Sequence, residues 1–275
     1  MTSYVGKKRG TFETNLQLRD SDLFVEPHDN KTHKRVLVAI EGEHGCAPLV
    51  ALSGFIGERK PVAYFVSRFM RHDSINTLPE PEPAGWPIYS INGTYVVMMR
   101  QIHTPESLGM HSQTMWTYYY PVFRDLAESI RYMGSTELEM LNVTYAHSVI
   151  PDEMFEQLPN DSVATYDMNE MSEEGESVFL HAPAWVLTWL FTKLNKTNEA
   201  SITSIGWDSD GTIDETATKT LVKYLGDKYD WEFDSESSEI VKQNILEAEE
   251  YEQEIMRNAF NVNTTKKNPD GVMFG

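Results

Sequence analysis

The 275-residue chain is poor in cysteine and in basic residues, and it has no long apolar run. Its single cysteine, Cys46, excludes an internal disulfide framework and a cysteine-rich zinc site. No segment approaches the roughly 20 consecutive apolar residues of a membrane span, and the N-terminal region lacks the apolar stretch of a signal peptide. We therefore expect a cytoplasmic protein that does not enter a membrane.

The shortage of basic residues also limits the partners of the chain. Asp and Glu number 42 against 23 Lys and Arg, which gives a net charge of −19. Binding to nucleic acid through its phosphates needs a basic stripe, which the sequence does not show, and an anionic membrane surface would repel the chain. Two interpretations of the acidity stay open: it provides solubility, or it steers the protein toward a basic protein surface.

The composition is otherwise that of a globular protein with a core, because 40% of the residues are hydrophobic and 11% aromatic. A chain of this length suits one large α/β domain or two small ones. The order of its segments favours one. We predict a polar N-terminal arm over residues 1–33, a single α/β domain over 34–260 that ends in an acidic helix, and a tail over 261–275.

The domain opens with the pattern of a β-α-β unit. Residues 36–40 form a continuous apolar run that ends at a glycine-bearing turn, which is typical of a buried central strand. A helix is predicted over 47–56, where Pro48 is tolerated in the first turn, and a second strand over 62–66. This arrangement favours a parallel sheet.

The middle of the chain alternates loops, strands and helices. Prolines in 78–87 lack amide donors and predict a surface loop, whereas Asn92-Gly93 predicts the turn of a hairpin between strands. A long helix is predicted over 110–133, bent or restarted at Pro121. The other predicted elements are strands over 88–91, 94–100, 138–146, 162–166, 177–180 and 201–205, and helices over 184–194, 214–225 and 238–260.

Aromatic residues are concentrated on two of the predicted helices. Five lie between Trp116 and Phe123, and Trp185 lies one turn before Trp189. Such residues either pack in the core or anchor a subunit interface, where Tyr and Trp are enriched. Both interpretations stay open for the tyrosine run, and we favour the core for Trp185.

One turn carries residues that could perform chemistry. Glu41, Glu43 and His44 follow the first strand, at the strand end where open α/β sheets bind ligands. A carboxylate beside an imidazole could act as a general acid and base, and two carboxylates could help to bind a metal. The alternative, which we favour, is a solvated turn shaped by its glycines. The spacing from Gly42 to Gly45 matches no phosphate-binding pattern.

The sequence ends with Met273, Phe274 and Gly275, which follow a polar run over 261–271. That run cannot bury enough apolar surface to fold alone, so we expect a flexible tether with an apolar, aromatic tip. Two apolar side chains followed by the α-carboxylate could fill an apolar slot and present a negative charge to a Lys or Arg. The alternative is a disordered end without a function.

Taken in order, these segments resemble the proteasome assembly chaperone family of archaea and some bacteria. The likeness covers about residues 36–275. It rests on the first strand with its glycine-bearing turn, and on Pro87-Ile88-Tyr89, 96–99, 103–109 and 202–206 at the corresponding places. The tip resembles the hydrophobic-tyrosine-any-residue tail that enters pockets of the proteasome α ring. Phe274 stands where tyrosine is usual, and the turn over 41–45 is less glycine-rich than expected.

The resemblance implies a three-layer α/β/α fold of the phosphorylase/hydrolase-like type, with a mixed, largely parallel sheet. It also implies a non-catalytic protein without a cofactor or metal. Met273 and Phe274 would fill a pocket between adjacent α subunits of the 20S proteasome, and the carboxylate of Gly275 would pair with a pocket lysine. A homo-oligomer would present several tails at once.

Two alternatives stay open. The protein could be an assembly factor or a cap or adaptor of the mature particle, which the tail cannot distinguish. It could also be a nucleosidase or hydrolase of the related fold that uses the Glu41–Gly45 turn.

Overall fold

The structure is a computed structural model, which describes most of the α/β domain and part of the N-terminal segment. The described residues are 8–9, 12–26, 32–40, 46–67, 85–99, 112–145, 158, 161–167, 182–196, 199–207, 213–247 and 250.

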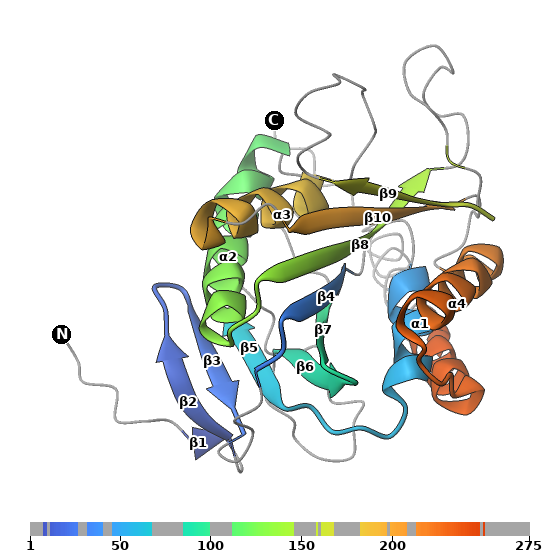
Figure 1. Cartoon of the computed structure of the whole chain (residues 1–275), viewed down its shortest axis with the longest axis horizontal. Helices are drawn as coiled ribbons and strands as arrows, with labels where there is room; N and C mark the ends of the chain where they lie inside the picture. Colours follow the sequence, from blue (N-terminus) through green and yellow to red (C-terminus); the bar gives the residue numbers. More distant parts are fainter. Residues whose placement is uncertain are drawn as a thin grey trace, which may run out of the picture.

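A ten-stranded mixed sheet forms the centre of the fold, in the order β1-β2-β3-β5-β6-β7-β4-β8-β10-β9 (Figure 1). The neighbouring strands β7 (Thr94–Met99), β4 (Arg35–Ile40), β8 (Glu137–Tyr145) and β10 (Ala200–Trp207) pair in parallel. All other pairings are antiparallel. The antiparallel strands are β1 (Lys8–Arg9), β2 (Phe12–Gln17), β3 (Ser21–Val25), β5 (Ala63–Ser67), β6 (Trp86–Ile91) and β9 (Val163–Asp167).

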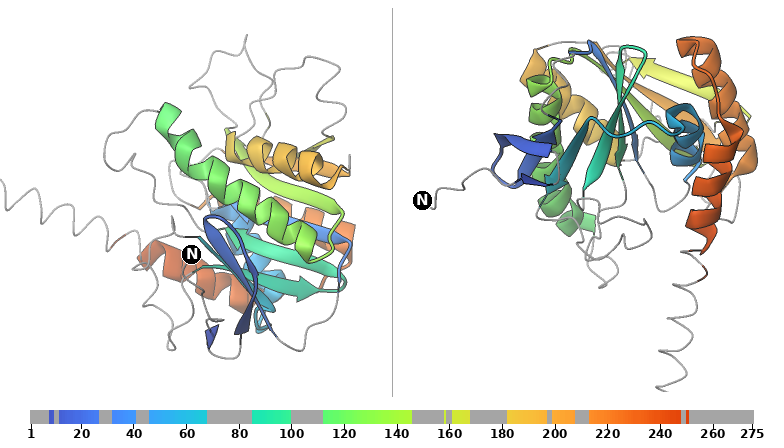
Figure 2. Two further views of the ribbon diagram at one scale, coloured as in Figure 1. Left: turned by 90° about the vertical axis from the view of Figure 1, so that its left-hand side faces the viewer. Right: turned by 90° about the horizontal axis from the view of Figure 1, so that it is seen from below.

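Four helices cover the two faces of this sheet, which confirms the three-layer α/β/α prediction. Helices α2 (Ser112–Tyr132) and α3 (Ala182–Asn195) lie on one face, and α1 (Ala47–Ile56) and α4 (Glu215–Tyr229) on the other (Figures 1 and 2). A further helical stretch over 235–247 follows α4.

The central strand β4 shows why its sequence is apolar throughout. Val36 and Val38 point into the core under α2 and α3, and Leu37 and Ala39 point into the core under α1. Successive side chains of a strand point to opposite faces, so a strand covered on both sides needs an apolar residue at every position.

Several local predictions are confirmed. Asn92 and Gly93 have φ values of 43° and 85°, as the tight turn between β6 and β7 requires. The predicted long helix is α2, which runs through Pro121 without a restart, and Gly134 follows it with a φ of 86°. The weak strand prediction over 162–166 corresponds to β9.

Three predictions need correction. The sheet is mixed but not largely parallel, because its parallel pairings are confined to the four central strands. Residues 12–25, predicted within a polar arm, contain strands β2 and β3 of the sheet, and β3 pairs with both β2 and β5 and buries Leu23 and Phe24. Trp86 and Pro87, predicted in a loop, begin β6, and proline is tolerated at the start of a strand. The strand predicted over 177–180 lies outside the described residues.

Candidate functional site

A cavity of about 310 Å³ opens at the end of the sheet where strands β4, β8 and β10 begin. This end of the sheet is opposite the one at which β4 ends, at Ile40. Helix α4 contributes Lys228 from its last turn. The charged and polar side chains that line the cavity are Arg35, Glu137, Glu139, Asp167, Glu199, Ser201 and Lys228.

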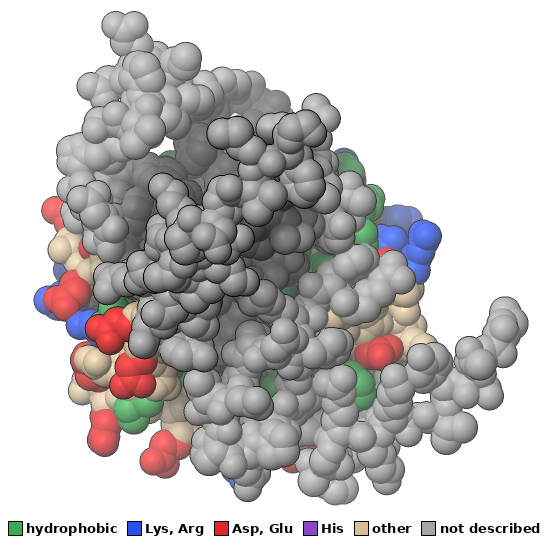
Figure 3. Space-filling view, turned by 180° about the vertical axis from the view of Figure 1, so that it is seen from behind, with side chains coloured by type: hydrophobic (Ala, Val, Ile, Leu, Met, Phe, Trp, Pro, Cys, Tyr) green, Lys and Arg blue, Asp and Glu red, His purple; other side chains and the backbone are tan. Residues whose placement is uncertain are grey.

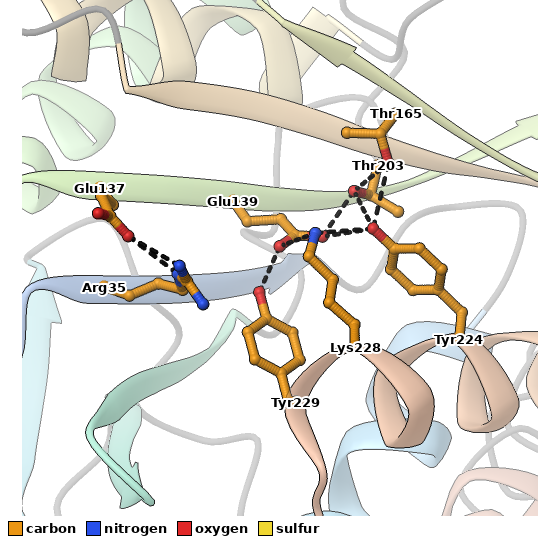
Figure 4. A network of polar contacts seen from close by, with 8 residues as sticks. All are labelled: Arg35, Glu137, Glu139, Thr165, Thr203, Tyr224, Lys228 and Tyr229. Carbon is orange, nitrogen blue, oxygen red and sulfur yellow. Dashed lines mark hydrogen bonds and ion pairs between the residues drawn. The ribbon is translucent and has the colours of Figure 1, made fainter.

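The carboxylate of Glu139 is the centre of a polar network beside this cavity (Figure 4). Its side chain is only 5% exposed, although Lys228 reaches it from α4 with Nζ 2.7 Å from Oε2. The hydroxyl of Tyr229 donates to the same oxygen. Thr203 and Tyr224 donate to Oε1 over 2.6 Å and 3.3 Å. Both carboxylate oxygens are therefore occupied by donors.

The surroundings of Lys228 and Tyr229 favour the protonated form of both side chains. Burial lowers the pKa of Lys228, but the charge and hydrogen bond of Glu139 outweigh it, so the pKa of Lys228 is raised. Burial, together with the charge of Glu139, raises the pKa of Tyr229. Lys228 therefore stays charged and Tyr229 stays a neutral donor. Such a carboxylate has no open position for a proton from a substrate.

Ion pairs line the rim of the cavity. Arg35 contacts Glu137 through both Nε and Nη2 at 3.0 Å, and Lys34 pairs with the same carboxylate. These hydrogen bonds, that of Lys34 first, lower the pKa of Glu137. The guanidinium of Arg35 also lies 5.5 Å from the centre of the Tyr229 ring. The arrangement fastens the end of α4 to the sheet, and we interpret it as structural.

The residues predicted from sequence to act at a site are not placed by the structure. Glu41, Glu43 and His44, and the tip Met273–Gly275, lie outside the described residues. Within the described ranges no cluster of three or more His, Cys, Asp or Glu could hold a metal ion. No helix in those ranges is long and apolar enough to cross a membrane.

The polar network was missed by sequence reasoning, although β8 carries a signal for it. Glu137 and Glu139 alternate with Leu138 and Met140 in a strand that pairs on both sides. A glutamate on a strand buried on both faces needs a cationic partner, and no sequence pattern shows that the partner comes from α4.

Among the aromatic residues of α2 and α3, Trp185 is placed differently from the prediction. Trp185, which we expected in the core, is 40% exposed and stacks on the partly buried Trp189, with ring centres 6.1 Å apart. Tyr120 is 41% exposed, whereas Phe123 is fully buried. The core therefore takes only part of the aromatic side chains on these two helices.

No protein-family model matches the sequence, and no curated protein matches it significantly. The fold, in contrast, occurs in solved structures of several archaeal proteins, and it is the fold of archaeal homologues of proteasome-assembly chaperones. PbaA of Pyrococcus furiosus, such a homologue, is 13% identical, with a TM-score of 0.54 over 87% of this chain and 99% of its own. PbaB of the same organism, an archaeal proteasome activator, is 14% identical, with a TM-score of 0.52 over 87% of this chain and 100% of its own.

A Thermoplasma acidophilum protein with unknown function is similar to the same extent, at 15% identity and a TM-score of 0.55 over 84% of this chain and 92% of its own. Identities this low establish the fold alone. The resemblance noted in the sequence is thus confirmed at the level of the fold.

Proposed function

We propose that this chain is a non-catalytic proteasome-binding protein that docks Met273, Phe274 and Gly275 into pockets of the 20S proteasome α ring. The observation that carries the proposal is the fold shared over most of both chains with PbaA and PbaB, a proteasome-assembly chaperone homologue and a proteasome activator. The apolar and aromatic tip of the sequence supports it independently, because it has the chemistry of a docking peptide.

The cavity at the N-terminal ends of β4, β8 and β10 agrees with a non-catalytic role. Glu139 is the buried carboxylate that would serve as a base there, and its two oxygens accept hydrogen bonds from Lys228, Tyr229, Thr203 and Tyr224. Releasing it would break the ion pair between β8 and the last turn of α4, so the network is a poor source of acid-base catalysis.

The expected strength of one tail is low. Burial of one Met and one Phe side chain contributes about 1.5–3 kcal/mol each, and a charged hydrogen bond to the carboxylate about 1.5–3 kcal/mol. Association costs about 4 kcal/mol or more in lost freedom. A homo-oligomer with several tails would bind far more tightly through effective concentration, and we propose that the protein acts in this form.

Capture by immobilised protein tests the proposal. The full chain should retain purified 20S particles and isolated α rings, and a variant without Met273–Gly275 should retain neither. A variant with one glycine added after Gly275 is the matched control, since it keeps both side chains and displaces only the carboxylate. It should bind weakly, because the pairing with a lysine would be lost.

The outcome also separates the two roles. Preference for free α rings would indicate an assembly factor, and preference for complete particles would indicate a cap or adaptor. Equal capture by the full and the shortened chain would refute tail docking. Capture by neither would remove the proteasome as a partner and return attention to the Glu41–Gly45 turn.

A further inference from the structure

The large hydrophobic side chains that are exposed among the described residues fall on two surfaces. Tyr120, Tyr132 and Trp185 belong to α2 and α3, whose outer side we call the aromatic surface. Phe233 and Ile240 belong to residues 230–247, which we call the acidic segment. Exposed aromatic and aliphatic side chains gathered in this way are typical of protein interfaces.

Tyr120 and Trp185 lie at similar distances from the adjacent ends of two neighbouring helices. Helices α2 and α3 lead into the parallel strands β8 and β10, and Arg131 at the end of α2 donates to the carbonyl of Leu194 at the end of α3. Tyr120 and Trp185 precede these ends by about 16 Å and 14 Å, at 1.5 Å per residue. Trp189 backs Trp185 by stacking, so the exposed ring is held in place.

The two surfaces have opposite charge. The acidic segment carries six acidic residues, all exposed, and only one basic residue, Lys242. Helices α2 and α3 carry three basic residues against two acidic ones, in a chain where acidic residues prevail by 42 to 23. Arg124 is paired with the buried Asp125 and with Asp20, which leaves Arg131 and Lys193 against Glu128. Figure 3 shows most of the visible Asp and Glu on one flank, where Lys or Arg also lies, and Lys or Arg beside hydrophobic side chains on the other, where acidic side chains are fewer.

The acidic segment is fixed on the far side of the sheet from the aromatic surface. Ser238 donates from its hydroxyl to the carbonyl of Val50 in α1 over 2.9 Å, and Phe233 packs edge-on against Phe55 of the same helix. The sheet therefore lies between the two surfaces, and one copy of the chain cannot bring them together (Figure 2).

We propose that the aromatic surface binds the acidic segment of a second copy of this chain, with Trp185 and Tyr120 against Ile240 and Phe233. Opposite charge and apolar content identify this occupant. Because the two surfaces differ, the contact is head-to-tail, and its repetition closes a ring or extends an open chain of copies. The inference rests on the self-association in the proposed function and names its interface.

Mixing two variants tests the head-to-tail geometry. Trp185→Glu disables the aromatic surface and Ile240→Lys the acidic segment, both at exposed positions, and circular dichroism verifies that each variant is folded. Light scattering after gel filtration should show an oligomer for the full chain and a monomer for each variant. An equimolar mixture should form a 1:1 dimer and nothing larger, because each pair retains one intact interface. The control Asp161→Lys, at an exposed position before β9 that belongs to neither surface, should stay oligomeric.

Charge reversal provides a second readout. Lys193→Glu should weaken self-association about tenfold at low salt and less at high salt, where the attraction is screened. A monomeric full chain, an oligomeric Trp185→Glu or Ile240→Lys variant, or a mixture that stays monomeric would each overturn the proposal. These masses are measured without proteasome, so this result and that of tail-dependent capture can fail separately.

Discussion

Replacing Gly54 with alanine should destabilise the protein, although alanine is the better helix residue. Gly54 lies inside α1, and a Cβ at this position would come within 2.7 Å of both Cδ2 and Cζ of Phe233, and closer still to Cε2. The backbone carbonyl of Gly54 also accepts the amide hydrogen of Asp234 over 2.9 Å. The start of the acidic segment therefore packs directly against Gly54.

The magnitude follows from the displaced ring. Phe233 is only 38% exposed. Displacing its ring from Gly54 therefore loses about 1–2 kcal/mol of free energy from burial and about 1 kcal/mol from the edge-to-face contact with Phe55. Replacing a helical glycine by alanine returns about 0.5–1 kcal/mol. We expect Gly54→Ala to lower the free energy of unfolding by about 1–2 kcal/mol.

Urea unfolding of a double-mutant cycle measures this directly. In a Phe233→Ala background the clash is absent, so Gly54→Ala should stabilise by about 0.5–1 kcal/mol. Gly226→Ala in α4 is the matched control, because its Cβ would meet no atom closer than 3.9 Å and should stabilise in the same way. A Gly54→Ala variant that is stabilised in the presence of Phe233 would refute the packing described here.

Three further predictions concern the polar network and the tail. Lys228→Met should lower the free energy of unfolding by about 2–3 kcal/mol, because it leaves the buried Glu139 carboxylate with hydroxyl donors only; a loss under about 0.5 kcal/mol in urea would contradict the ion-pair role. The raised pKa of Tyr229 means that the native state keeps a proton that the unfolded chain loses. Its contribution is therefore complete below the ordinary tyrosine pKa of about 10 and declines as the pH rises above it. Alkaline titration of Tyr229→Phe should show a smaller decline, and an unchanged one would exclude this cause. Phe274→Tyr should tighten binding to α rings about fivefold, from one hydrogen bond of about 1 kcal/mol, as measured by surface plasmon resonance; weaker binding would argue against a tyrosine-type pocket.

The sequence identified the elements whose local pattern is sufficient to define them. The unbroken apolar run of β4 predicted a strand buried on both faces, and Asn92-Gly93 predicted the turn between β6 and β7. Strands β2 and β3 were missed because they are short and their apolar residues, such as Leu23 and Phe24, lie in a mostly polar segment. The pairing direction of the strands was mispredicted because local patterns do not report which strands become neighbours.

Side-chain environments were harder to predict than elements. Trp185 follows a helical apolar spacing that is typical of core residues, but the core beneath α3 is filled by Leu187, Leu190 and Phe191. Glu139 and Lys228 are 89 residues apart, and only the packing of α4 on the sheet brings them into contact. Such contacts between distant segments decide which polar residues are structural, and a single sequence does not contain them.

The most direct test of the proposed function is photo-crosslinking from the tip of the tail. A photoreactive phenylalanine analogue at position 274 should crosslink to proteasome α subunits in the presence of α rings, and the same group at the exposed position 60 should not. Excess of a peptide that ends in Val-Met-Phe-Gly should suppress the crosslink. Crosslinking that is equal from both positions, or absent from 274 while the protein still binds the ring, would contradict docking through Met273, Phe274 and Gly275.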